Sequence, residues 1–247
     1  MKIIVYGVTN WDSKAQADYL CPSLEEWRNR VRYFLHDPEI FMTTGTYSDS
    51  KFNPLNIPLI QNCITKTRPY SKEWNYFRNG FITGCWHGLL NMEFDILFHV
   101  QCRTFLGVDL ISDLHRFMDS NKQIMAPRYV SKTRNITNSV EVGCMAMKPD
   151  AVRLFTSFGV RPSLSPYDQV NCEKEALDLF GNSWYNNKPE ISTIRKRESS
   201  FGKDMDEDIS KEEFMSLPII AAQKHASEQD IFDWCLAHPY GNNGGIK

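Results

Sequence analysis

The sequence has no long apolar run, and this absence limits where the protein is expected to act. The short apolar run within residues 1–6 is too short for a signal peptide, and no other stretch of the 247 residues approaches the roughly 20 apolar residues of a membrane-crossing helix. We therefore expect no integral membrane segment and a cytoplasmic location.

The chain also lacks a large excess of charge of either sign. It has 28 lysines and arginines against 30 aspartates and glutamates, for a formal net charge of -2. Proteins that bind nucleic acid over a broad surface usually carry a strong basic bias. We therefore expect no nucleic-acid partner, although a local basic cluster can still contact phosphate.

Paired cysteines are missing as well. The seven cysteines are odd in number and widely spaced, and none forms the close pair of a zinc knuckle. This usage is typical of reduced, buried thiols in a cytosolic protein.

Several common catalytic motifs are absent. The sequence has no Gly-x-Ser-x-Gly elbow, no His-Glu-x-x-His and no P-loop. Gly80-x-x-x-Gly84 falls within a predicted helix and not in a strand-to-helix turn. These absences argue against triad hydrolases, zincins, P-loop enzymes and most nicotinamide-dependent enzymes.

What is present indicates one globular domain over residues 1–247. Hydrophobic residues make up 42% and charged residues 23% of the chain, which suits a soluble protein with a sizeable core. We expect a charged, flexible excursion at about residues 195–213 and a disordered tail at about 241–247.

Helix and strand patterns alternate along the chain. Apolar runs predict strands at residues 2–8, 39–46, 57–65, 94–100, 123–129 and 140–147, and amphipathic patterns predict helices at 23–36, 79–90, 109–118, 151–158, 168–179 and 227–236. Ser23 is the predicted N-cap of the first helix, with Glu26 three residues later. This order predicts an α/β fold with a mostly parallel central sheet flanked by helices.

The stretch from residue 79 to 107 contains the first candidate site. Its buried strand stops abruptly at Gln101-Cys102-Arg103-Thr104. In open α/β sheets, ligands collect beyond the carboxyl ends of the strands. These residues are therefore a site hypothesis, and an ordinary strand-to-loop exit is the alternative.

Two further groups are candidates for nucleotide contacts. Tyr6, Gly7 and Thr9 end the first strand, where backbone groups and a hydroxyl can contact a base and ribose; Tyr6 is equally suited to the core. Asn79 and Gly80, if they lie at a helix N-terminus, would suit an anion, because unpaired amides and the helix dipole favour phosphate there.

The order of these parts resembles the compact GT-A fold of glycosyltransferases that use nucleotide-diphospho-sugars. Arg78-Asn79-Gly80 is similar to the family's helix opening, although a spacer residue is missing. The strand at 96–100 resembles the one that ends in the family's Asp-x-Asp motif, and residues 142–151 resemble its small-residue strand beneath the acceptor. The resemblance spans roughly residues 2–185 and implies a single-domain GT-A enzyme.

The chain departs from this family at the Asp-x-Asp position, which Gln101-Cys102-Arg103 occupies. Two carboxylates hold a divalent cation in the family, whereas a glutamine offers one neutral oxygen and an arginine repels a cation. Our hypothesis is that Arg103, with Arg78, contacts the donor diphosphate directly. On this hypothesis, transfer does not require a divalent metal (Mn or Mg), and the sequence assigns no metal ligands.

The resemblance also implies a general base for an inverting transfer. Glu173 best matches the family's acidic position, Asp168 is the second candidate and Glu175 the third. Asp168 is equally suited to cap the helix that follows it. His238 resembles a late histidine that some GT-A enzymes add to the metal or diphosphate.

The implied partners are a nucleoside-diphosphate sugar as donor and a glycan, a protein-linked glycan or another hydroxyl compound as acceptor. Two alternatives stay open at this point. The missing acidic pair is compatible with a catalytically inactive GT-A-like binding or scaffold protein. A sugar nucleotidyltransferase is the other, although residues 7–11 are a poor version of the glycine-rich basic loop of that class.

Overall fold

The computed structural model describes residues 1–9, 14–44, 57, 86, 88–131, 136–140, 143–158, 190–192, 211–221 and 228–240. The helix predicted at 168–179 and the tail at 241–247 lie outside these residues, as does nearly all of the strand predicted at 57–65.

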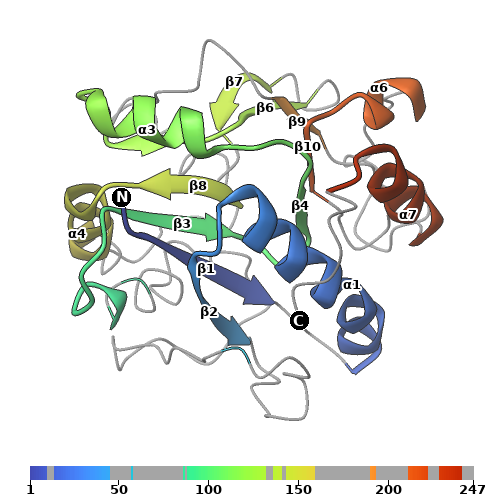
Figure 1. Ribbon diagram of the computed structural model, residues 1–247, viewed down its shortest axis with the longest axis horizontal. Helices are drawn as coiled ribbons and strands as arrows, with labels where there is room; N and C mark the ends of the chain where they lie inside the picture. The colour runs from blue at the N-terminus through green and yellow to red at the C-terminus, as the bar shows by residue number, and fades with distance from the viewer. Residues whose placement is uncertain are drawn as a thin grey trace.

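The central sheet has five strands in the order β2-β1-β3-β8-β5 (Figure 1). These are β1 (Ile3–Thr9), β2 (Glu39–Thr44), β3 (Ile96–Val100), β5 (Ile124–Met125) and β8 (Cys144–Met147). β1 runs parallel to β2 and β3, whereas β8 is antiparallel to both β3 and β5. Only β8 therefore opposes the other strands, and the predicted mostly parallel sheet is confirmed.

A second sheet was not predicted. Its order is β4-β10-β9-β6-β7, with β4 (Thr104–Leu106), β6 (Arg128–Ser131), β7 (Ile136–Val140), β9 (Glu190–Ser192) and β10 (Ile219–Ala221). The strand predicted at 123–129 divides at Ala126-Pro127 into β5 and β6, because proline has no N–H to donate to a ladder. Of the strand predicted at 140–147, Val140 ends β7 and residues 144–147 form β8, and residues 141–142 lie outside the described part of the chain.

The helices are α1 (Lys14–Phe34), α3 (Ile111–Asp119), α4 (Pro149–Phe158), α6 (Lys211–Met215) and α7 (Glu228–Ala237). The prediction that Ser23 caps the first helix is wrong, because α1 begins at Lys14 and passes through Pro22. A proline inside a helix costs about 3 kcal/mol, but the complete burial of Trp27 and Val31 anchors the turns that follow. Residues 211–213, which the predicted charged excursion included, are helical, and its other residues lie outside the described part of the chain.

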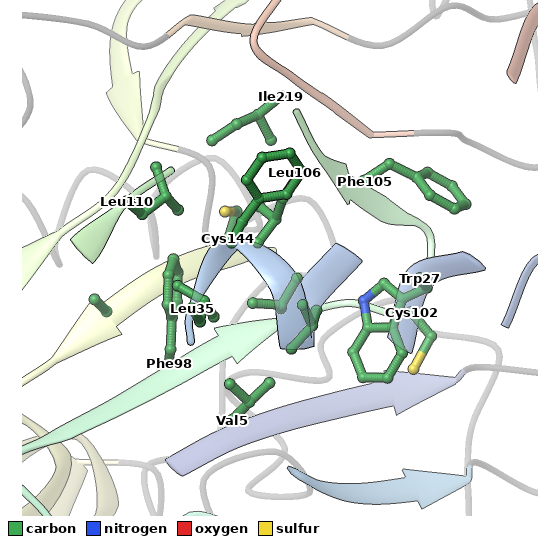
Figure 2. Packing of buried hydrophobic residues seen from close by; sticks show 14 of the residues in the cluster. Val5, Trp27, Leu35, Phe98, Cys102, Phe105, Leu106, Leu110, Cys144 and Ile219 are labelled. Atoms are coloured by element: carbon green, nitrogen blue, oxygen red, sulfur yellow. The ribbon is translucent and has the colours of Figure 1, made fainter. Parts of the chain in front are cut away.

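Two apolar clusters cover opposite faces of the central sheet. Val5 and Phe98 face α1 and the second sheet, together with Trp27, Leu106 and Ile219 (Figure 2). On the other face, neighbouring strand positions belong to a cluster with Ile4, Tyr6, Trp86, Leu97 and Met145. The alternation along β1 and β3 therefore assigns each side chain to one of two packed layers.

No helix in the described part of the chain is both long and apolar enough to cross a bilayer.

Candidate functional site

The carboxyl ends of β1 and β3 meet at one edge of the central sheet. The two strands are parallel neighbours, with Tyr6 opposite His99 in the register. Three residues after Tyr6, Thr9 pairs with Thr44 at the last rung between β1 and β2. The predicted contacts at Tyr6, Gly7 and Thr9 and the turn that follows β3 therefore share one edge.

Residues 101–104 form a tight, hydrogen-bonded turn, which we call the 101–104 turn. The Gln101 N–H donates to the carbonyl of Gly143 at 2.8 Å, and the Thr104 N–H donates to the carbonyl of Gln101 at 2.8 Å. Nε of Arg103 donates to Oε1 of Gln101 at 3.1 Å. The first and third side chains of the turn are thus paired and half-buried at the sheet edge.

The middle residue of the turn, Cys102, points into the protein. It is buried in the cluster beneath α1 (Figure 2), and burial raises the pKa of its thiol well above the ordinary value. A thiol that stays protonated is a poor nucleophile and a poor metal ligand. Cys102 therefore anchors the turn.

Gly7 leaves the space that Cys102 and Trp27 fill. A Cβ atom at residue 7 would lie 2.9 Å from Sγ of Cys102 and 2.6 Å from Cη2 of Trp27. Both distances are shorter than side chains tolerate, so packing alone accounts for the glycine. Only its backbone is left for the donor contact predicted at this position.

Tyr6 and His99 are fully buried on the opposite face of the sheet. The ring centroids of Tyr6 and His99 are 5.4 Å apart, and the Trp86 ring approaches His99 edge-on at 5.4 Å. The burial of Tyr6 favours the core alternative for that residue over stacking on a base. Desolvation lowers the pKa of His99 to about 3, so its imidazole is neutral at physiological pH.

Arg30 of α1 holds the strand that leaves the turn. It is 1% exposed, and Nη1 donates to the carbonyls of Leu106 at 3.0 Å and His238 at 2.9 Å. Nη2 donates to the carbonyl of Cys235 at 3.0 Å, and Nε pairs with Glu26 at 2.7 Å. This one side chain joins α1, the end of β4 and the end of α7.

His238 lies at the end of α7, where it packs on Trp234. The two rings stack with centroids 4.2 Å apart, and Nδ1 of His238 lies 3.0 Å from the Trp234 carbonyl. These contacts account for the position of the imidazole without a ligand. The role that the resemblance suggests for His238 remains a prediction.

The 101–104 turn does not fit a divalent cation. The amide oxygen of Gln101 already accepts a hydrogen bond from Arg103, and the adjacent guanidinium repels a positive ion. Within the described ranges, no three His, Cys, Asp or Glu side chains come together as a metal would require. The chemistry of this turn suits an anion instead.

Five predicted site residues lie outside the described part of the chain. They are Arg78, Asn79, Gly80, Asp168 and Glu173. Of the remaining five, Gln101 and Arg103 contact each other, whereas Tyr6 and Gly7 are buried. The backbone of Thr9 ends β1 at the same edge.

Sequence reasoning missed three residues around this edge. Trp27 and Arg30 read as ordinary positions of an amphipathic helix, and His99 read as one strand residue among many. The available signals were an arginine three residues after a tryptophan and a histidine inside an otherwise apolar strand.

The sequence has no significant match to a protein-family model or to a curated protein. Among solved structures, the fold is similar to a glycosyltransferase involved in the glycosylation of the major capsid of PBCV-1, with a TM-score of 0.53 and 6% identity over 96% of this chain and 100% of that chain. This similarity shows a shared fold over nearly the whole chain.

Two other solved structures are more distant. The glycosyltransferase GlyE of Streptococcus pneumoniae TIGR4 has a TM-score of 0.41 and 11% identity, over 74% of this chain and 44% of that chain. A putative glucose-1-phosphate thymidylyltransferase from Bacillus anthracis, in complex with a sucrose, has a TM-score of 0.41 and 10% identity, over 72% and 83%.

Proposed function

We propose that the protein transfers a sugar from a nucleoside-diphosphate sugar to a hydroxyl group of a glycan or protein-linked glycan. One observation carries this proposal. The paired Gln101 and Arg103 lie beyond the carboxyl end of β3, in a chain that shares the fold of a glycosyltransferase along nearly its whole length. Ligands of open α/β sheets bind at this edge.

In the proposed reaction, the acceptor oxygen attacks the anomeric carbon of the donor sugar. The bond between that carbon and the diphosphate oxygen breaks, and the diphosphate leaves with the electron pair. Arg103, together with Arg78, neutralises the growing negative charge by charge-assisted hydrogen bonds. Glu173, or Asp168 in its place, accepts the proton of the acceptor hydroxyl, which gives inversion at the anomeric carbon.

This role for Arg103 replaces the charge that a cation would supply. A guanidinium can bond two phosphate oxygens at once through its planar fork. The proposal therefore includes activity without a divalent metal. Complete loss of transfer in excess EDTA, reversed by Mn²⁺, would overturn this part of it.

The decisive experiment measures transfer and donor hydrolysis by the purified protein with a panel of UDP- and GDP-sugars, with and without EDTA. Release of the nucleoside diphosphate is the readout. Glu173→Gln is expected to reduce turnover at least 100-fold with donor affinity retained, because it removes the base and keeps the side-chain shape. Unimpaired transfer by this variant would exclude Glu173 as the base.

A second candidate function is a binding protein without catalysis. The observation in its favour is the absence of an acidic pair in the 101–104 turn. Binding of a sugar nucleotide, seen as a thermal shift, with neither transfer nor hydrolysis under any metal condition would favour it. Release of pyrophosphate from a nucleoside triphosphate and a sugar phosphate would instead identify a nucleotidyltransferase.

A further inference from the structure

His99 is a polar side chain that is fully buried within an apolar strand. Its exposed fraction is 0%, and among the residues that the structure describes neither Nδ1 nor Nε2 has a hydrogen-bond partner. A neutral imidazole carries one N–H donor and one acceptor nitrogen. Leaving both unsatisfied in the interior destabilises a protein, so such a group calls for an explanation.

Packing does not supply that explanation. The flanking positions of β3 are Leu97, Phe98 and Val100, all fully buried. The rings of Tyr6 and Trp86 lie against His99. A phenylalanine at residue 99 would make the same ring contacts without two unsatisfied nitrogens. The polar atoms at this position therefore serve something other than the stability of the core.

The position of His99 on the sheet indicates the role of its two ring nitrogens. Side chains alternate along a strand, and the ladder of β3 with β8 continues one residue past the strand, through the hydrogen bond from the Gln101 N–H to the Gly143 carbonyl. Residues 97, 99 and 101 therefore share one face. His99 lies between the core at Leu97 and the candidate site at Gln101, beside the end of β1.

We propose that His99 is a donor-binding residue, whose imidazole forms a hydrogen bond with the nucleoside of a bound nucleoside-diphosphate sugar. This inference rests on the proposed function and deepens it. The nucleoside is the part of the donor expected near β1, where Tyr6 pairs with His99 in register. The diphosphate belongs with Arg103, two residues beyond Gln101.

Binding then includes a side-chain movement. Because the imidazole is fully buried, a ligand reaches it after neighbouring side chains move. Binding is favoured because the ring nitrogens of His99 gain a hydrogen-bond partner in the complex. The donor pocket is accordingly deeper in the bound state than in the free protein.

The test compares His99→Phe, which keeps the ring and removes both nitrogens, with His99→Gln, which keeps a donor and an acceptor. His115→Phe on the exposed face of α3 is the control. UDP and GDP are titrated by calorimetry against the unsubstituted full chain at pH 7.5, and the nucleotide that binds is used for the variants. Inorganic pyrophosphate is titrated as a second probe.

We expect His99→Phe to raise the melting temperature of the free protein and to weaken nucleotide binding about tenfold, which is the loss of one hydrogen bond. His99→Gln should retain part of the affinity, and pyrophosphate binding should not change. Nucleotide affinity unchanged in His99→Phe, or an equal loss for pyrophosphate, would overturn the inference alone. If neither nucleotide nor any UDP- or GDP-sugar binds the unsubstituted protein, the proposed function fails and this inference with it.

Discussion

The space beside Gly7 is occupied by the thiol of Cys102: a Cβ atom at residue 7 would lie 2.9 Å from that sulfur. Gly7 lies in β1, and Cys102 lies in the turn that follows β3, the parallel neighbour of β1. Cys102 points inward because Gly7 has no side chain, and Gln101 and Arg103 then face the sheet edge. The pairing of a glycine with an inward cysteine thus sets how the 101–104 turn presents its polar groups.

Gly7→Ala should therefore disturb both stability and donor binding. The new methyl group also meets Trp27 at 2.6 Å, and overpacking of this kind costs about 1–3 kcal/mol. Combining it with Cys102→Ala removes one of the two clashes and should recover part of the loss. Urea unfolding and nucleotide titration of the single and double variants measure this coupling.

Gly107→Ala is the matched control for this experiment. Its Cβ would lie 2.8 Å from Cη2 of Trp234 and 2.9 Å from the Pro218 carbonyl. We expect a similar loss of stability that Cys102→Ala does not relieve. Equal rescue of both alanine variants by Cys102→Ala would show that the effect is not specific to the contact with Gly7.

Arg103 should contribute to donor affinity through its guanidinium fork. Arg103→Ala is expected to lower kcat/KM about 10- to 100-fold, the range for a lost charged hydrogen bond. Arg103→Lys keeps the charge but not the two-point contact, and should recover only part of the loss. Transfer kinetics with a saturating acceptor measure the effect.

The control for Arg103 is Arg116→Ala, which removes an exposed arginine on α3 that pairs with Asp113. It should leave kcat/KM unchanged, since surface ion pairs contribute little. If both variants lose activity equally, charge in general, rather than the turn, supports the reaction.

Arg30→Met should destabilise the protein by about 3–5 kcal/mol. The substitution leaves the carbonyls of Leu106, Cys235 and His238 without their buried donor, and the carboxylate of Glu26 without its cation. Arg32→Met is the comparison, because Arg32 is 40% exposed and pairs with Asp37 at the surface. Its expected effect is below about 1 kcal/mol, and similar urea midpoints for the two variants would contradict the central role of Arg30.

His99 should make the free protein less stable in mild acid. Burial lowers its folded-state pKa to about 3 from the ordinary value of 6.5, so the unfolded chain binds the proton more readily between these two values. This effect does not reduce the free energy of unfolding above pH 6.5, and it reduces that free energy progressively as the pH falls from 6.5 toward 3. The full reduction is about 5 kcal/mol, at 1.36 kcal/mol per pKa unit.

The measurement is the free energy of unfolding from pH 7.5 to 4.5 for the unsubstituted protein, His99→Phe and His115→Gln. Carboxylates titrate in all three, so the difference between curves isolates His99. His99→Phe should lose stability less steeply below pH 6.5, whereas His115→Gln should follow the unsubstituted protein. Parallel curves for all three would mean that His99 is protonated at little cost.

Local sequence patterns predicted three strands of the central sheet and three helices. β1, β2, β3, α3, α4 and α7 lie close to where periodicity places them, because their buried faces repeat at the spacing of a strand or a helix. The start of α1 was missed because Pro22 is a strong local stop signal, which the packing of the following turns overrides. The second sheet was missed because its strands are short and pair across large sequence separations.

The same division applies to the candidate site. Polarity after a buried strand was enough to single out residues 101–104 and the end of β1. The inward turn of Cys102, its contact with Gly7 and the pairing of Gln101 with Arg103 could not be predicted, because they depend on which strands are neighbours. The sequence did not single out His99, because a sequence does not show which buried polar atoms have hydrogen-bond partners.

By itself, the sequence determined that the chain forms an α/β protein with one apolar strand ending in a polar turn without an acidic pair. Composition and periodicity are local properties, and they suffice for that. Only the tertiary structure decided which side chains face the sheet edge and which are buried beneath it. The physical reason is that burial and hydrogen bonding are set by contacts between segments far apart in the chain, such as Gly7 with Cys102 and Arg30 with Leu106.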